Sequence, residues 1–315
     1  RNRLYNPVTT WLIFLGQTIS PDHSCRSAIA QSRAAGLLST KASVHTGGYC
    51  QARDRLSESP LHHLACGLGE ALMEAEAPQE RWHGRRVIVV DGSSVSLPDT
   101  PANQDAYPQS SRQTPGCGFP TMYLCGLMSL TSGAILDLEP GTGNGNELSL
   151  WRRLWHHLRP GDVVLGDGKY SSYADVAVLQ NKGVDTVARM GKRKTDFREG
   201  KIICQGDHIV EWERPRKIPP WVGDQPLPER LRVREIHFRV DIPGFRSESI
   251  TLVTTLLDSE KYPQEDIAGL FFERWQVELR LRDIKTVLGM DLLRTKTPQR
   301  ARKALWMYLT AYNLL

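Results

Sequence analysis

The spacing of hydrophobic and polar positions divides the chain into segments of different secondary structure. Residues 1–82 are rich in Ser, Ala and Leu and lack the alternation typical of strands, which predicts helices. From Arg85 the chain has runs of branched residues, as in "RRVIVVDGSSVSL", which predict buried strands. Short alternating runs in residues 191–249, rich in Pro, Trp and charged residues, predict a β-rich insertion. A long helix is predicted from Pro263 to about Met290, and another begins near Pro298.

Strands and helices alternate between the helical front and the insertion. The runs "VIVVD", "TMYLCGLMSL", "AILDLEPG", "DVVLGDGKY" and "VDTVARM" predict five strands, with a loop over Pro98–Pro120. Residues 146–158 predict an amphipathic helix capped by Asn146, and a second helix begins at the cap Ser172 and stops at Gly183. The order β, β, β, α, β, α, β predicts an α/β fold, in which helices flank a mixed sheet.

The stretch "STKASVHTGGYCQARDRL" predicts a short helix, a turn at Gly47-Gly48 and a second helix that carries Arg53 and Arg55. Small helical hairpins of this kind often bind DNA. The alternative is a helical cap that packs on the next domain, and composition does not separate the two.

Charge and cysteine content narrow the class of protein. The 315 residues carry a net charge of +5, which is compatible with a nucleic-acid partner without requiring one. None of the six cysteines forms a CxxC pair, so we expect neither a zinc site nor a disulfide scaffold, but reduced thiols in a cytoplasmic protein. No segment is long enough to span a membrane. Because the chain begins at Arg1 and ends within a predicted helix, we expect a fragment of a longer reading frame.

Two aspartates follow runs of Val, Ile and Leu, and each is followed by glycine: Asp91 in "VIVVDGS" and Asp167 in "VVLGDGK". The ends of strands in open α/β sheets display functional groups, whereas Asp-Gly is also a common turn pair. Because two such pairs occur in one mixed sheet, a functional site and a pair of ordinary turns are comparable interpretations of these aspartates.

A third carboxylate lies in the late helix "FFERWQVELRLRDIK". At about 100° per residue, Glu278 shares one face with four other side chains, namely Phe271, Arg274, Arg282 and Lys285. One interpretation is a set of salt bridges at i,i+4 spacing on a solvated face, each worth a few tenths of a kcal/mol. The other is a metal site, because two strand-end acids and one helical acid suit a pair of divalent ions about 3.5–4 Å apart.

The same residues resemble a known family. The spacing Phe271-x2-Arg274-x3-Glu278-x6-Lys285 is similar to the Tyr-Arg-Glu-Lys signature of DDE transposases of the insertion-sequence-4 type. "VVDGSSVSLPDT", "GDGKYSSYADVAVLQNKGVD", "RMGKRKTDFREG" and "TGGYCQARDRL" also look like that family. The resemblance implies a helical DNA-binding domain over residues 1–82 and an RNase H-like core over 83–190 and 250–315, interrupted by the insertion at 191–249.

The resemblance also implies roles for individual residues. Asp91, Asp167 and Glu278 become catalytic ligands of Mg²⁺, with Mn²⁺ as a substitute. Arg274 and Lys285 become contacts to DNA phosphates, and Arg282, Lys169, Phe271 and Arg53 are further candidate DNA contacts. Phe271 replaces the signature tyrosine and loses its hydroxyl, and Gly168-Lys169-Tyr170 shifts the family's basic residue by one position, so both departures point to reduced activity.

The family's reaction is cut-and-paste transposition through a DNA hairpin, which implies double-stranded DNA as partner, both as terminal inverted repeats and as target. It also implies a homodimer that joins two ends, and a bacterial protein of the cytoplasm that acts at the nucleoid. Trp212 and Trp221 are candidates to stack on a flipped base, worth about 1–3 kcal/mol, or else form a small core of the insertion. Two other functions stay open: a catalytically impaired DNA-binding remnant, and an RNase H-like nuclease that acts on RNA–DNA hybrids.

Two pairs of adjacent histidines, His62-His63 and His156-His157, suggest metal ligands at first sight. Neighbours on a helix point about 100° apart and rarely share one ion, so we expect surface or core roles for both pairs.

Overall fold

The structure is a computed structural model that describes residues 4–39, 43–111, 113–143, 147–190, 200–240 and 248–315, without the side chains of residues 240, 248, 275–281 and 283. Its helices, with 3-10 helices labelled η, are α1 (Pro7–Ile19), α2 (Cys25–Ala34), α3 (Gly47–Arg55), α4 (Glu58–Glu74), η1 (Pro78–Glu80), α5 (Pro101–Ala106), α6 (Glu147–Arg153), η2 (Leu154–His157), η3 (Gly168–Tyr170), α7 (Tyr173–Asn181), η4 (Pro220–Val222), α8 (Gln264–Thr286) and α9 (Pro298–Leu314). Its strands are β1 (Val87–Ser96), β2 (Thr121–Ser129), β3 (Ile135–Gly141), β4 (Val163–Gly166), β5 (Asp185–Arg189), β6 (Lys201–Cys204), β7 (Asp207–Glu213), β8 (Arg230–Val240) and β9 (Glu248–Thr254).

The described strands form one mixed sheet in the order β3-β2-β1-β4-β5-β9-β8-β7-β6. Strands β1, β4 and β5 are parallel to one another, and the remaining neighbours are antiparallel. The prediction of a mixed sheet flanked by helices is therefore confirmed. The predicted order of strands and helices holds from β1 to β5, except that the short helix α5 lies within the segment predicted as a loop.

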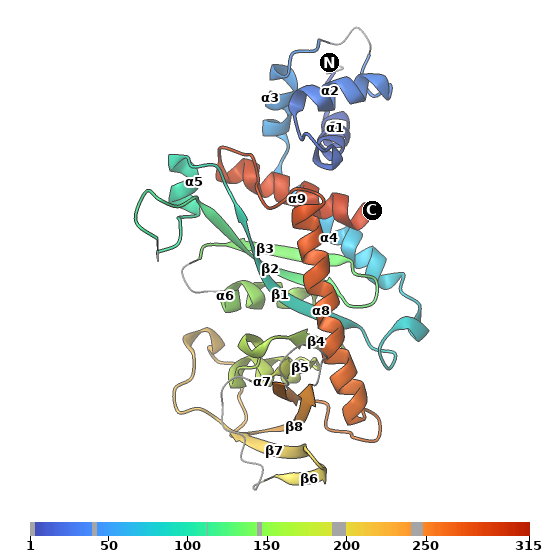
Figure 1. Cartoon of the computed structure of the whole chain (residues 1–315), viewed down its shortest axis with the longest axis vertical. Coiled ribbons are helices and arrows are strands. Elements are labelled where there is room, and N and C mark those ends of the chain that lie inside the picture. The colour runs from blue at the N-terminus through green and yellow to red at the C-terminus, as the bar shows by residue number, and fades with distance from the viewer. Residues whose placement is uncertain (1–3, 40–42, 112, 144–146, 191–199, 241–247) are drawn as a thin grey trace.

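Each face of the sheet has its own hydrophobic core, because alternate residues of a strand point to opposite faces. Val87 and Val89 of β1 belong to one buried cluster with Ile284 of α8 and with residues of α9 and α4. Ile88 and Val90 belong to a second cluster, formed with residues of α6, η2 and α7. Full burial of each such side chain is worth about 1.5–3 kcal/mol. Figure 1 shows α8 lying across the sheet on the first of these faces.

The first three helices form a small group with a buried cluster of their own around Ile13, Ile29 and Tyr49. The side chain of Asn6 caps α1, and that of Ser24 caps α2. Gly47 and Gly48 do not form the predicted turn between two helices, because they are the first residues of α3. Figure 1 places this group on the side of α9 that faces away from the sheet.

The last four strands of the order continue the sheet instead of forming a separate one. Strand β9 pairs with β5 on one side and with β8 on the other, and β7 and β6 follow in turn. The division of the chain at residues 191 and 249 stays a prediction, since parts of both junctions lie outside the described residues. In the part of the chain that is described, no helix combines the length and the apolar composition that crossing a membrane requires.

Candidate active site

Asp91 lies in the middle of β1, so the prediction that it ends the strand is wrong. The antiparallel partner β2 pairs with β1 from Ile88 to Ser96, whereas the parallel partner β4 pairs only with Val87–Val89. Between Val89 and Ser96, β1 therefore has no strand partner on its β4 side, although its strand conformation continues. Asp91 therefore lies at an unpaired edge of β1, where the sequence predicts the end of the strand.

Asp167 directly follows the last residue of β4, as predicted, and its Oδ1 accepts a hydrogen bond from the backbone N–H of Lys169 at 2.8 Å. The β1–β4 register pairs Val89 with Leu165, and its extension by two residues places Asp91 level with Asp167. The alternation along both strands places the two aspartates on the face that α8 covers. The sheet therefore presents two half-buried carboxylates side by side, toward this helix.

Helix α8 is fixed to the sheet at both of its ends. Just before the helix, the backbone carbonyl of Tyr262 accepts a hydrogen bond from the buried guanidinium of Arg234 on β8 at 2.6 Å. Just after it, Ser96 at the end of β1 donates its N–H to Asp291 and accepts one from Leu293. Glu278 lies between these two attachments in α8, and its side chain is outside the described residues.

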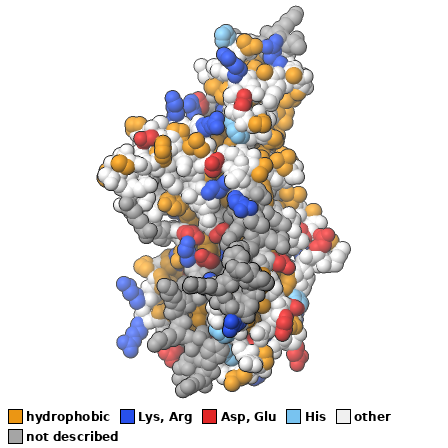
Figure 2. Space-filling view, viewed as in Figure 1, with side chains coloured by type: hydrophobic (Ala, Val, Ile, Leu, Met, Phe, Trp, Pro, Cys, Tyr) orange, Lys and Arg blue, Asp and Glu red, His pale blue; other side chains and the backbone are white. Residues whose placement is uncertain are grey.

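A cleft of about 710 Å³ opens beside Asp91 and joins the two faces of the sheet. Gly92 of β1, Lys169 of η3 and Lys285 of α8 line it together. Lys285, which the resemblance implies as a phosphate contact, and Lys169, a further candidate DNA contact, therefore meet at one opening next to the paired aspartates. Figure 2 shows acidic side chains gathered near the middle of the face it draws, next to atoms that are not described.

A fourth carboxylate, Glu147 at the start of α6, belongs to this cleft and was missed in the sequence. It accepts hydrogen bonds from the Lys169 ammonium, at 3.1 Å, and from the hydroxyl of Tyr170. The hydrogen bond to Glu147 raises the pKa of Lys169. A Cβ atom at Gly92 would lie 2.6 Å from the Glu147 carboxyl carbon, so the glycine makes room for this side chain. The sequence feature that could have identified Glu147 is its position as the first residue of a helix, directly after the loop "GTGNGN".

We expect Glu147→Gln to lower the rate of metal-dependent DNA cleavage by about 10–100-fold, the usual loss when a group that orients a metal site is changed. The amide keeps the shape of the side chain but weakens its hydrogen bonds with Lys169 and Tyr170, which lie two and three residues after Asp167. Gly92→Ala should reproduce the loss, because it displaces the same carboxylate. Glu139→Gln, on the neighbouring strand β3, removes an exposed pair with Arg153 and is the matched control. Unchanged cleavage by both site variants in a single-turnover assay contradicts this role.

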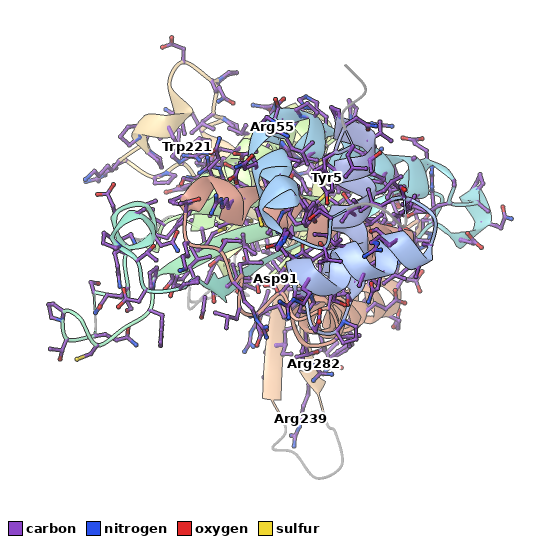
Figure 3. The ribbon with its side chains drawn as sticks, turned by 90° about the horizontal axis from the view of Figure 1, so that it is seen from above. Tyr5, Arg55, Asp91, Trp221, Arg239 and Arg282 are labelled. Carbon is purple, nitrogen blue, oxygen red and sulfur yellow. The ribbon has the colours of Figure 1, made fainter. Side chains whose placement is uncertain are left out.

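The predicted DNA contacts on α8 fall into different environments. Arg282 is exposed, and Lys285 is half-buried in the cleft. Arg274 is half-buried, with its guanidinium 5.6 Å from the centre of the Phe271 ring. Figure 3 shows Arg282 on the same side of the molecule as Arg239, with Asp91 further in. Lys169 is exposed beside the cleft.

Phe271 is buried, although the helical projection places it on one face with Glu278 and the basic residues of α8. It is 3% exposed and belongs to the same buried cluster as Ile236 of β8 and Leu252 of β9. The sheet continues past β5 into these two strands, so the first half of α8 is covered where an isolated helix would be exposed. Phe271 therefore has no surface to offer to a phosphate.

Trp212 and Trp221 are both half-buried, and the indole hydrogen bond of Trp212 lies within the predicted insertion, whereas Trp221 packs against residues of the core. The indole N–H of Trp212 donates to Glu235 at 2.9 Å. The ring of Trp221 packs edge-on against Trp155 at 5.7 Å, and the guanidinium of Arg152 lies 4.0 Å from its centre. Figure 3 shows Trp221 well to one side of Asp91. Base stacking by either residue stays a prediction.

Arg53 lines a second, basic cleft of about 240 Å³ between α3 and the start of α9. It donates to the side chain of Gln17 at 3.0 Å and stacks on the ring of Phe14. The other basic residues that line this cleft are Arg294, Lys296, Arg300 and Lys303, against the single acid Asp54. Five cations around one opening form an electropositive site suited to phosphate groups.

Comparison with known proteins now identifies the family. The family model described as "Transposase DDE domain" matches residues 82–314. The chain belongs to the DDE transposase domain family. It is 26% identical over 271 residues to the transposase InsG for insertion sequence element IS4 of Escherichia coli K12, and the match covers 84% of this chain and 59% of that protein. It is 22% identical over 280 residues to the transposase for insertion sequence element IS231F of Bacillus thuringiensis subsp. israelensis, covering 74% of this chain and 56% of the other.

These matches confirm the resemblance to the insertion-sequence-4 type of DDE transposase. The chain spans somewhat more than half the length of these two curated relatives. The family assignment concerns the domain that residues 82–314 form.

Proposed function

We propose that the protein is a DNA transposase that cleaves the ends of an insertion sequence and joins them to target DNA, as the names of its relatives suggest. The observation that carries this proposal is the placement of Asp91 and Asp167. Asp91 lies in β1 and Asp167 directly follows its parallel neighbour β4, so the extended register brings them level. Both face a helix whose Lys285 shares a cleft with Lys169. Paired carboxylates beside lysines form the combination that phosphodiester cleavage requires.

The RNase H-like architecture of the core is part of the proposal. It is supported by the strand order β3-β2-β1-β4-β5, in which β2 alone runs antiparallel to both of its neighbours. Strands β6 to β8 are added at the far edge, before the helix that carries Glu278. The helical front, the core and the inserted strands then correspond to the three predicted parts of the chain.

Asp91, Asp167 and Glu278 would hold the divalent ions, with Mg²⁺ as the expected metal and Mn²⁺ as its substitute. The donor set fits, because carboxylate oxygens are the ligands that Mg²⁺ prefers. Among the described side chains, no group of three acids, cysteines or histidines within 4.8 Å of one another contains these aspartates, and the third ligand that the resemblance implies is Glu278. When bound, divalent ions would stabilise the negative charge that develops on the phosphate oxygens during cleavage.

The chain's own basic residues would bind and orient the DNA. Lys169 and Lys285 lie on opposite faces of the sheet end and can hold phosphates on both sides of the cut. The hydrogen bond from Lys169 to Glu147 keeps the ammonium at the cleft before DNA arrives. Arg282 adds an exposed cation along the same helix, and Arg274 is a further candidate contact.

The basic cleft between α3 and α9 would contact the DNA away from the cut, which explains why Arg53 lies far from the aspartates. Figure 2 shows further Lys and Arg side chains over the upper half of the molecule. A partner of double-stranded DNA and a homodimer that pairs two ends complete the proposal.

Replacing Arg294 and Lys296 together with alanine is expected to weaken binding to all DNA sequences and to lower the salt slope of log K by about two, one for each cation lost. Both side chains are exposed at the basic cleft. Arg230→Ala, on the exposed face of β8, should leave the slope unchanged. Fluorescence anisotropy over a range of KCl concentrations measures it, and an unchanged slope in the double variant contradicts the DNA path.

The test of the function is cleavage of a plasmid that carries the ends of the element encoding this chain. We expect Mg²⁺-dependent strand breaks at those ends and joining of the freed 3′ ends to a second plasmid. Specific binding without cleavage, in the intact protein, would establish the impaired remnant instead. Preferential cleavage of RNA–DNA hybrids over duplex DNA would establish the nuclease.

A further inference from the structure

His62 and His157, which come from different pairs of adjacent histidines, both contact the buried carboxylate of Asp137. His62 on α4 and His157 in η2 both direct Nε2 to Asp137 of β3, at 2.9 Å from its Oδ1 and 3.1 Å from its Oδ2. Helix geometry separates the two members of each pair, as expected, but it does not prevent members of different pairs from meeting. Asp137 is 1% exposed, so this meeting point lies inside the protein.

A buried cysteine completes the group. Cys66 lies one helical turn after His62 on α4, and its buried thiol lies close to Asp137. One ligand atom from each of His62, Cys66 and Asp137 lies within 4.8 Å of the other two. A nitrogen, a sulfur and an oxygen at this spacing are the three kinds of ligand that zinc takes in proteins.

A second layer of hydrogen bonds orients the carboxylate. His157 donates from Nε2 to Asp137, and its Nδ1 lies 2.9 Å from the carboxylate of Glu70, one further turn along α4. An imidazole that donates to two carboxylates is a cation, and it balances Glu70. Burial alone would raise the pKa of Asp137, but the hydrogen bonds from His157 and His62 outweigh it and hold the pKa well below its usual range. Asp137 is therefore an oriented, ionised ligand.

We propose that His62 Nε2, Cys66 Sγ and an oxygen of Asp137 bind one zinc ion, with a solvent molecule in the fourth position. The side chain of His62 is 32% exposed, which gives an ion a path to the site. Zn²⁺ with one thiolate, one carboxylate and one neutral imidazole has no net charge, so its burial carries a small electrostatic cost. Mg²⁺ is excluded by the thiolate and the imidazole, since it prefers oxygen.

Protons balance in the exchange. Without zinc, the hydrogen bond to Asp137 keeps a proton on His62 Nε2, and burial raises the pKa of the Cys66 thiol. Entry of the ion releases the thiol proton to solvent. A protonated His62 also releases its Nε2 proton and keeps the one on Nδ1, whereas a neutral His62 moves its proton from Nε2 to Nδ1, so one or two protons leave. No redox step is involved.

The site would fasten the helical front to the catalytic sheet. Helix α4 supplies two ligands from outside the matched family domain, and β3 supplies the third from the end of the sheet order. Trp306 of α9 stacks on the ring of His62, with centroids 4.1 Å apart, and closes the site from a third element. The expected absence of zinc was based on CxxC pairs, whereas this site needs a single cysteine.

The test is to add zinc to the metal-stripped protein in competition with a chromophoric chelator. We expect one equivalent of Zn²⁺ to bind, to release up to two protons, and to raise the thermal unfolding temperature. Co²⁺ in its place should give an intense thiolate-to-cobalt charge-transfer band. Excess Mg²⁺ should displace neither ion.

Four variants make the test specific. Cys66→Ser and His62→Gln, both close in size, should abolish the stoichiometric binding, and Cys66→Ser should also remove the cobalt band. Cys117→Ser removes an exposed thiol elsewhere and should change nothing. Glu70→Gln touches no ligand, folds because the residue lies at the surface, and should weaken binding by about 10–100-fold through His157.

Circular dichroism confirms that each variant is folded. Binding of less than half an equivalent to the folded wild-type protein overturns the proposal, and so does equal binding by folded Cys66→Ser. Because the readout is metal binding and not DNA cleavage, it is independent of the transposase function.

Discussion

Asp91→Asn and Asp167→Asn are each expected to abolish metal-dependent DNA cleavage while leaving DNA binding nearly intact. The two carboxylates lie level on adjacent strands and would share the divalent ions. Asparagine keeps the shape of the side chain but loses the negative charge that holds the metal. We expect a loss of at least about 10³-fold in the single-turnover rate, which corresponds to about 4 kcal/mol of transition-state stabilisation.

Two further measurements separate this result from misfolding. Asp105→Asn, at an exposed position on α5, applies the same change away from the cleft and should cleave at the wild-type rate. Both site variants should keep the wild-type unfolding temperature, because removing one of two neighbouring negative charges costs the fold little. Cleavage by either site variant within tenfold of wild type would refute the assignment of these aspartates.

The sequence predicts most of the architecture because its periodicities are strong. The runs of branched residues before Asp91 and Asp167 form buried strands, as their composition predicts. Ser172 caps the start of α7, and Gly183 adopts the positive φ that ends it, as their backbone preferences predict. The sequence also predicts that Lys285 shares the helix face of Glu278, since it follows two turns later, but the meeting of Lys285 with Lys169 comes from the folded structure.

The misses arise where a residue's surroundings come from distant parts of the chain. Phe271 is buried because strands β8 and β9 extend the sheet beneath α8, which helical periodicity alone does not reveal. Asp91 lies within a strand because β2 is longer than β4. Glu147 and Asp137 acquire partners only when the helices fold onto the sheet.

Extension of the sheet also explains how the inserted strands position the acidic helix. Arg234 of β8 forms two hydrogen bonds with the carboxylate of Asp207 on β7, and its third nitrogen donates to the carbonyl of Tyr262 before α8. Both charged side chains are 1% exposed. The ion pair therefore connects the inserted strands to the start of the helix that carries Glu278.

Asp207→Asn should destabilise the protein by about 3–5 kcal/mol, because it leaves the guanidinium of Arg234 buried without its counter-charge. The double variant Asp207→Leu with Arg234→Met removes both charges and should recover most of that loss. Urea unfolding followed by circular dichroism measures both.

The same two strands carry a matched control, the exposed pair of Arg230 and Glu211 at 3.2 Å, whose removal should cost at most about 1 kcal/mol. If α8 takes its position from the buried pair, Asp207→Asn should also slow DNA cleavage under conditions where the protein is still folded, and the double variant should restore it only in part, since the hydrogen bond to Tyr262 is lost. Equal stability losses from the buried and the exposed pair would contradict this account of how the inserted strands support the candidate active site.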